Sequence, residues 1–231
     1  IFERVLGKSH PDTASTLNNL GGNLNSQGRF IQAEDILRSA LLIRERVLGE
    51  DHLNTAISYT ALAYNLQNQG KNTEAGRFFS LAVAIRERVL GVEHPATVKS
   101  HGNVAFNLNA KGKWAEAEKI FRYVVEISKR VYPPDHPEMI TVYGNLGSNL
   151  DAQRKHVEAE PFLRKSVSIS NRVLGFKHSG TAISYNNLAT NLDAQGKTFE
   201  AKTLAKKSMK ICCRALGKNH PTCVSLKNNW R

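Results

Sequence analysis

The stretch Asn187–Gly196 reads NLATNLDAQG, and the chain repeats this pattern at regular intervals. Four earlier copies, each starting 42 residues before the next, are NLGGNLNSQG from Asn19, ALAYNLQNQG from Ala61, NVAFNLNAKG from Asn103 and NLGSNLDAQR from Asn145. A fixed period of this length is typical of repeat architectures, in which each unit buries its apolar face against its neighbours. The sequence therefore predicts an array of units.

The composition is that of a water-soluble chain. Of the 231 residues, 41% are hydrophobic and 23% are charged, and no run of about 18 apolar residues offers a membrane span. The opening IFERVLG has no signal-peptide features, so a cytoplasmic location is expected. Cys212, Cys213 and Cys223 form no CxxC pair, so we predict neither a disulfide framework nor a zinc site, and no cofactor.

Histidine, proline and glycine mark the borders of the units. Histidine recurs every 42 residues, usually followed by proline, at His10, His52, His94, His136, His178 and His220. Glycine stands three residues before most of these histidines. Because glycine accepts the left-handed conformation that ends a helix, and proline suits the first helical turn, each histidine is expected at or near a helix N-cap.

Each unit is predicted to contain two helices. Apolar residues recur at helical spacing after each histidine, as at Leu17, Leu20 and Leu24, and this A helix ends at a turn such as Gln27-Gly28-Arg29. A second helix, the B helix, follows the turn. The predicted array comprises the end of a preceding B helix at 1–9, repeats 1 to 5 at 10–51, 52–93, 94–135, 136–177 and 178–219, and a partial A helix at 220–231. The partial units indicate a segment of a longer array or larger polypeptide.

Small residues occur where the two helices of a repeat must approach closely. They are Gly21, Ala63, Ala105, Gly147 and Ala189 in the A helices, and Ala33, Ala75, Ala117, Ala159 and Ala201 in the B helices. With the IRERVLG motif and the HP pairs, this pattern resembles the tetratricopeptide repeat (TPR), in particular the 42-residue repeats of kinesin light chains and many bacterial TPR proteins. The resemblance covers essentially the whole chain. It implies an all-α fold, a right-handed superhelix (α-solenoid) of antiparallel helix pairs whose A helices line a concave, peptide-binding groove.

Three charged or titratable columns have a structural explanation. Histidines one repeat apart lie roughly 10 Å or more from one another, too far to share a metal ion, so no metal site is predicted. Acids gather in the first turn of the B helices, at Glu34, Glu74, Glu116, Glu118, Glu158 and Glu160, and arginines in the last turn, at Arg46, Arg88, Arg130, Arg172 and Arg214. The helix dipole favours this order without any ligand.

Two asparagine columns have two explanations that the sequence leaves open. The first column is Asn23, Asn65, Asn107, Asn149 and Asn191, and the second, four residues earlier, is Asn19, Asn103, Asn145 and Asn187. Asparagine is a mediocre helix former, and a buried amide needs partners. The amides either form a ladder between adjacent repeats or bind the backbone of an extended peptide, since an amide both donates and accepts.

The TPR resemblance places a further set of residues toward the groove. The candidate peptide-binding residues are Asn18, Asn19, Asn25, Tyr64, Gln67, Lys99, Asn103, Phe106, Asn109, Asn145, Asp151, Asn186, Asn187 and Thr190. Lys99 is the one cation among them, so this set does not favour a clamp for a terminal carboxylate. Tyr64 and Phe106 are candidate anchors for an apolar side chain.

The net charge of +12 concentrates at the end of the chain, since nine of the basic residues and one acid lie between Lys197 and Arg231. Lys202, Lys206, Lys210 and Arg214 follow one another at i+4 spacing with Lys207 beside them. Like charges at this spacing destabilise a helix by about 0.2–0.5 kcal/mol per pair. The stripe is either a solvated face or a site for a polyanion such as nucleic acid.

No P-loop, nucleophile elbow or metalloprotease motif occurs, so the sequence predicts no enzyme. The predicted function is a non-catalytic scaffold that holds a peptide of a protein partner in the groove. Two alternatives remain: a basic convex face of repeat 5 that binds nucleic acid or another polyanion, and a structural segment whose partial end helices favour end-to-end self-association. No membrane partner is expected.

Overall fold

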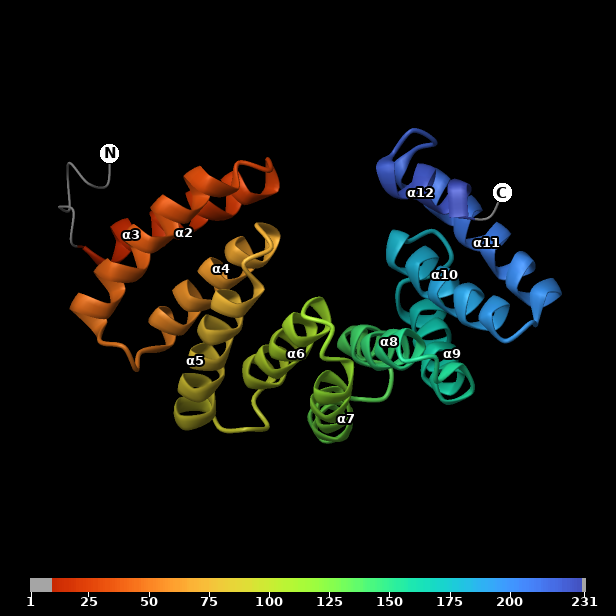
Figure 1. Cartoon of the computed structure of the whole chain (residues 1–231), viewed down its shortest axis with the longest axis horizontal. Helices are drawn as coiled ribbons and strands as arrows, with labels where there is room; N and C mark the ends of the chain where they lie inside the picture. Colours follow the sequence, from red (N-terminus) through yellow and green to blue (C-terminus); the bar gives the residue numbers. More distant parts are fainter. Residues whose placement is uncertain (1–9, 230–231) are drawn as a thin grey trace. The chain divides into compact units, whose positions relative to one another are not determined.

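A computed structural model describes residues 10–229 of the chain, and in that range it consists of helices joined by short turns, without strands. The A helices are α2 (Pro11–Ser26), α4 (Leu53–Asn68), α6 (Pro95–Ala110), α8 (Pro137–Ala152) and α10 (Ser179–Ala194). The B helices are α3 (Phe30–Leu48), α5 (Asn72–Leu90), α7 (Trp114–Val131), α9 (His156–Val173) and α11 (Thr198–Leu216), and α12 (Pro221–Asn229) follows. Figure 1 shows these helices in chain order.

The chain forms two compact units, whose border falls between Lys113 and Trp114. Unit 1 contains α2 to α6 and unit 2 contains α7 to α12, and consecutive helices within each unit pack pairwise. The border lies in the turn between the two helices of predicted repeat 3. The predicted end of a B helix at 1–9 and the last residues of the partial A helix, 230–231, lie outside the described residues.

The histidine column caps the A helices, as the sequence predicted. His10, His52, His94, His136 and His178 are each the N-cap residue, with an extended backbone and a side chain that accepts from the backbone N–H two residues later. The Nδ1 atom of His52, for example, lies 3.0 Å from the nitrogen of Asn54. A side-chain acceptor at this position satisfies one of the free N–H groups of the first turn.

The small residues allow the A and B helices of one repeat to approach closely. A Cβ atom placed on Gly21 would lie 2.5 Å from Cγ of Leu37, and one on Gly147 would lie 2.6 Å from Cγ of Leu163. The alanines at the equivalent positions of the other A helices are fully buried. The TPR-like pattern therefore marks actual helix contacts.

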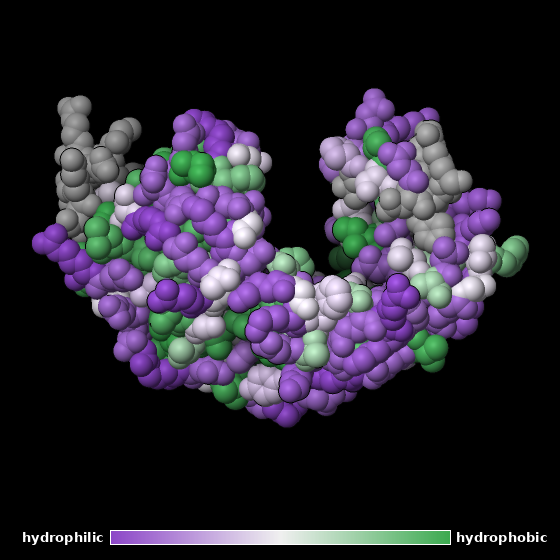
Figure 2. All heavy atoms as spheres, in the orientation of Figure 1, coloured by the Kyte–Doolittle hydropathy of each residue, from purple (hydrophilic) through white to green (hydrophobic). Residues whose placement is uncertain are grey.

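On the face shown in Figure 2, hydrophilic residues cover most of the surface and hydrophobic residues form separate patches.

The turn between the A and B helices requires a left-handed residue. Gly28, Gly70, Gly112 and Gly196 fill this position with φ between 71° and 78°. In repeat 4 the same position is Arg154, whose φ is 62°. Because the Cβ atom disfavours this conformation, Arg154 is held there by the surrounding turn.

The cysteines correct one prediction from the sequence. Cys213 and Cys223 form a disulfide between α11 and α12, with their Cα atoms 5.6 Å apart. The sequence predicted no disulfide framework because its three cysteines form no CxxC pair. The turn of residues 217–220 brings α12 back against α11, so a spacing of ten becomes direct contact. Cys212 is a free and buried thiol, and burial raises its pKa.

Candidate functional site

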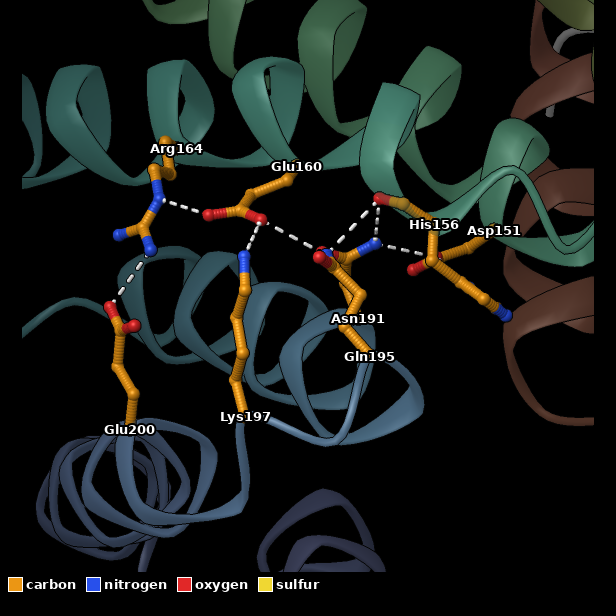
Figure 3. A network of polar contacts seen from close by, with 8 residues as sticks. All are labelled: Asp151, His156, Glu160, Arg164, Asn191, Gln195, Lys197 and Glu200. Carbon is orange, nitrogen blue, oxygen red and sulfur yellow. Dashed lines mark hydrogen bonds and ion pairs between the residues drawn. The ribbon is translucent and has the colours of Figure 1, made fainter.

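Three asparagines of the first column, Asn65, Asn149 and Asn191, join consecutive repeats. Figure 3 shows the junction between repeats 4 and 5, where Nδ2 of Asn191 on α10 donates to the backbone oxygen of His156 (2.8 Å) and to Oδ1 of Asp151 (2.6 Å). Gln195, one turn later, donates to Glu160 on α9 (3.0 Å) and to Oδ1 of Asn191 (2.8 Å). The fully buried Asn191 amide is therefore satisfied within the fold, which favours the ladder over peptide binding for this column.

A carboxylate lies at the centre of the same junction. Glu160 accepts from Lys197 (2.6 Å) and Arg164 (2.8 Å), and Arg164 also bonds to Glu200 on α11 (2.9 Å). Burial alone would raise the pKa of Glu160, but the hydrogen bonds from Lys197, Arg164 and Gln195 outweigh it and lower the pKa to about 2. The helix dipole was the only role that the sequence indicated for Glu160, whereas its carboxylate also joins neighbouring repeats.

We call this set of six residues the junction network. It occurs as Glu34, Arg38, Asn65, Gln69, Lys71 and Glu74, as Glu118, Arg122, Asn149, Gln153, Lys155 and Glu158, and as Glu160, Arg164, Asn191, Gln195, Lys197 and Glu200. In each set the asparagine donates to the backbone oxygen of the first residue of the preceding B helix. The pKa values of Glu34 and Glu118 are also lowered to about 2, because hydrogen bonds outweigh burial.

The junction between repeats 2 and 3 lacks this network. Gly76, Ser80 and Lys111 stand where the other junctions have glutamate, arginine and glutamine. Asn107 on α6 is buried, yet its Nδ2 has no hydrogen-bond partner. Its Oδ1 lies only 2.7 Å from the place where a Cβ on Gly76 would be, so a glutamate at position 76 would displace this asparagine.

A cavity of about 660 Å³ adjoins this junction on α5 and α6. Its lining includes Arg77, Leu81, Asn107 and Leu108. Leu108 is only half-buried, whereas the equivalent Leu66 of repeat 2 is fully buried. The helix packing around Asn107 is therefore looser than in repeat 2.

The A helices of unit 1 bring together several predicted peptide-binding residues. Tyr64 on α4 donates its hydroxyl to Oδ1 of Asn103 on α6 (2.6 Å), and its ring meets that of Phe79 edge-on at 5.2 Å. Tyr64 is 40% exposed, and Phe106, three residues after Asn103, is 52% exposed. Two exposed aromatic rings on neighbouring A helices offer contact area to an apolar side chain.

A cation that sequence reasoning missed lies close to Tyr64. Arg86 reaches from the B helix α5 and donates from Nη1 to the hydroxyl of Thr60 on α4 (3.1 Å) and to that of Ser100 on α6. Within residues 10–229 no carboxylate pairs with Arg86. Burial lowers the pKa of Arg86, although a guanidinium remains charged at neutral pH. The site therefore holds a partly desolvated positive charge with neutral partners.

Arg44 occupies the equivalent position of repeat 1. It is 5% exposed and donates from Nη1 to the backbone oxygen of Asn54 (2.8 Å) and to the hydroxyl of Ser58 (2.9 Å), and from Nη2 to that of Ser15 (3.1 Å). Repeats 3 to 5 carry Ser128, Ser170 and Cys212 at this position. This contrast was visible in the sequence, but helical periodicity does not reveal that the side chain reaches the A helices.

The other predicted residues divide by their surroundings. Oδ1 of Asn25 accepts from Asn65 (2.7 Å), and Oδ1 of Asp151 accepts from Asn191 and bonds to His156, so both oxygens are used within the fold. Asn18 is buried beside Ser58, and Oε1 of Gln67 is buried without a partner. Asn19, Lys99 and Thr190 are exposed, and Asn109, Asn145, Asn186 and Asn187 are half-buried.

The basic stripe lies on the exposed side of α11. Lys202, Lys206, Lys207, Lys210 and Arg214 are all exposed, and in the described part of the chain none of them forms an ion pair. By contrast, Arg38, Arg122 and Arg164 on the earlier B helices each bond to two glutamates. The described residues include no cluster of three or more metal-binding side chains and no helix long and apolar enough to cross a membrane.

Family models match nearly the whole chain. One model described as tetratricopeptide repeat matches residues 12–67, 98–172 and 139–214. A second model with the same description matches residues 55–96. The chain belongs to the tetratricopeptide repeat family.

Solved structures support this assignment. A Podosopora anserina protein of kinesin-light-chain type, with nearly identical TPR-like repeats, is 25% identical, with a TM-score of 0.75 over 90% of this chain and 98% of that one. BtubC (BKLC) from P. vanneervenii is 20% identical, with a TM-score of 0.75 over 91% and 84%. A Rap protein in complex with competence and sporulation factor is 16% identical, with a TM-score of 0.74 over 90% and 58%. A search of curated proteins finds no match.

Proposed function

We propose that this protein is a non-catalytic protein-interaction scaffold whose unit 1 holds a peptide segment of a partner against the A helices. Membership of the TPR family supports the scaffold role, and the Rap protein solved in complex with competence and sporulation factor is a precedent on a similar fold. The observation that carries the peptide proposal is Arg86, a partly buried cation without a carboxylate that lies close to the exposed Tyr64.

The chemistry of this surface defines the expected peptide. A partly desolvated guanidinium gains from a carboxylate, which it binds with charge-assisted hydrogen bonds. Tyr64 and Phe106 offer apolar contact area, and the free Nδ2 of Asn103 can donate to a peptide carbonyl. The preferred segment therefore carries an acidic residue near an aromatic or aliphatic one. Lys99, exposed on α6, adds a second positive charge.

The decisive variant is Arg86→Ser, because repeats 3 and 4 already carry a buried serine at this position. A peptide array probed with the whole chain identifies segments, whose affinities are then measured by fluorescence anisotropy. We expect Arg86→Ser to weaken acidic segments at least tenfold while the thermal unfolding midpoint changes little, and Asn103→Ala to weaken them less. Lys206→Gln, which removes a cation from α11, is the control.

Two results would count against the proposal. The array could select segments without acidic residues, or Arg86→Ser could bind the selected peptides as tightly as the unchanged chain. In either case Arg86 would have only a structural role between α4 and α6.

The unpaired lysines of α11 favour a second, anion-binding site on the other unit.

A further inference from the structure

In the last complete repeat, a lysine replaces the acid of an ion pair that occurs earlier in the chain. In repeats 2 and 4 an arginine near the end of the B helix bonds to an acid 37 residues before it: Arg88 to Asp51, and Arg172 to Asp135 at 3.1 and 2.5 Å. The corresponding arginine of repeat 5 is Arg214, and the residue 37 positions earlier is Lys177. Two cations thus stand where repeats 2 and 4 pair the arginine with an acid, and Arg214 forms no ion pair with the described residues.

A cavity of about 230 Å³ lies beside Arg214 in unit 2. Its lining comes from the α9–α10 turn, from α10 and from α11, and consists of Phe176, Tyr185, Lys207, Lys210, Ile211 and Arg214. Phe176 is 65% exposed, and Nζ of Lys207 lies 5.9 Å from the centroid of the Tyr185 ring. The cavity thus combines two aromatic rings and an isoleucine with three cations.

Repeat 4 shows that the aromatic part alone is not unusual. There Lys165 lies 5.3 Å from the ring centroid of Tyr143, as Lys207 does over Tyr185. However, Asp135 neutralises Arg172, and Ser168, which accepts from Arg172 at 2.9 Å, stands at the position of Lys210. Of these two equivalent sites, only the one in repeat 5 therefore has cations that no acid neutralises.

The size and lining of the cavity limit its occupant. A volume of about 230 Å³ is below the roughly 300–1,000 Å³ of pockets that hold a whole small-molecule ligand, so it suits one side chain. Three cations without acids favour an anionic occupant, and the arginine fork matches a carboxylate or phosphate group. The rings of Phe176 and Tyr185 pack against an apolar body. A nucleic-acid backbone would use the cations but not the two aromatic rings.

We propose that this cavity binds an anionic side chain of a protein partner, a carboxylate or phosphate ester whose apolar stem or ring lies on Phe176 and Tyr185. Of the cations of the α11 stripe, Lys207, Lys210 and Arg214 line the site, whereas Lys202 and Lys206 lie outside it. The site is independent of Arg86 and the A-helix surface of unit 1, so either can fail alone.

The test uses small probes on the whole chain and follows NMR chemical shifts. Phenyl phosphate and 3-phenylpropionate carry the two anions on a ring, phenol lacks the charge, and inorganic phosphate lacks the ring. We expect either or both ring anions to bind at least tenfold more tightly than phenol and inorganic phosphate. The tighter of the two identifies the partner's group as a phosphate ester or a carboxylate.

Matched variants separate the cavity from the general charge of α11. Lys177→Asp introduces the acid found in the Arg88–Asp51 and Arg172–Asp135 pairs, so it should pair with Arg214 and weaken the ring anions at least tenfold, as Arg214→Gln should. Lys202→Gln and Lys206→Gln remove charge from the same helix outside the cavity and should change binding less than twofold. Thermal unfolding checks that each variant folds.

Several outcomes would overturn the proposal. Equal losses in all four variants would show a diffuse cationic face, and equal binding of inorganic phosphate would remove the role of the rings. A single-stranded DNA oligonucleotide that binds tightly and depends equally on Lys202, Lys206 and Arg214 would favour the polyanion surface. Unchanged binding in Lys177→Asp would show that the missing acid does not create the site.

Discussion

The two asparagines Asn65 and Asn107 provide a stringent test, because the same residue in equivalent places has opposite surroundings. Nδ2 of Asn65 donates to Oδ1 of Asn25 and to the backbone oxygen of Phe30, and its Oδ1 accepts from Gln69. The Nδ2 of Asn107, equally buried, has no partner. We therefore expect Asn65→Ala to be far more destabilising than Asn107→Ala.

The magnitude follows from the hydrogen bonds lost. Asn65→Ala removes three hydrogen bonds, each contributing about 0.5–1.5 kcal/mol net, and leaves the buried oxygen of Phe30 without this donor. A loss of about 2–4 kcal/mol is expected. Asn107→Ala also deletes buried atoms, which destabilises the fold. However, it removes a buried N–H donor that has no partner, and this offsets part of the loss. The decrease in the free energy of unfolding should therefore stay below about 1 kcal/mol.

Urea unfolding of the whole chain, followed by circular dichroism, measures the difference. Because repeat arrays can unfold in parts, amide hydrogen exchange should also show that the loss in Asn65→Ala is centred on α3 and α4. Gln69→Ala, which removes a second member of the same network, should show an intermediate loss. Equal destabilisation by Asn65→Ala and Asn107→Ala would refute the reasoning.

Three other predictions concern the turn, the carboxylates and the disulfide. Arg154→Gly should stabilise the chain by about 0.5–1 kcal/mol, measured by urea unfolding, because glycine relieves the left-handed residue at φ 62°; Gly196→Arg should have the opposite effect. The carboxylates with pKa values of about 2, below their ordinary 4.5, stabilise the fold fully above pH 4.5, and this contribution should be lost as pH falls toward 2. Because the partners of these carboxylates are exposed, we expect each network to contribute only about 1–2 kcal/mol to the free energy of unfolding. Glu118→Gln should flatten the pH dependence of the melting temperature. Cys223→Ser should increase hydrogen exchange in α12 but not in α10, since the disulfide closes a short loop worth roughly 2–3 kcal/mol; unchanged exchange in α12 would show that packing alone holds it.

Much of the fold follows from local rules that the sequence shows directly. The positions of the A and B helices follow from the 42-residue period, the capping histidines and the turn glycines, because helix ends and left-handed turns have strong residue preferences. Gly21 and Gly147 also indicated the close helix contacts. Such features depend on residues that are near in sequence and that recur in most repeats.

The tertiary structure decided what the recurrent polar residues do. The amide of Asn191 has the same sequence context whether it binds a peptide or a backbone oxygen, and only its 2.8 Å contact with the oxygen of His156 distinguishes these roles. Arg86 is a B-helix residue whose side chain reaches the A helices, and Cys213 meets Cys223 across a turn. Period and propensity describe each helix separately, whereas partners 14 to 40 residues away are fixed by how the helices pack.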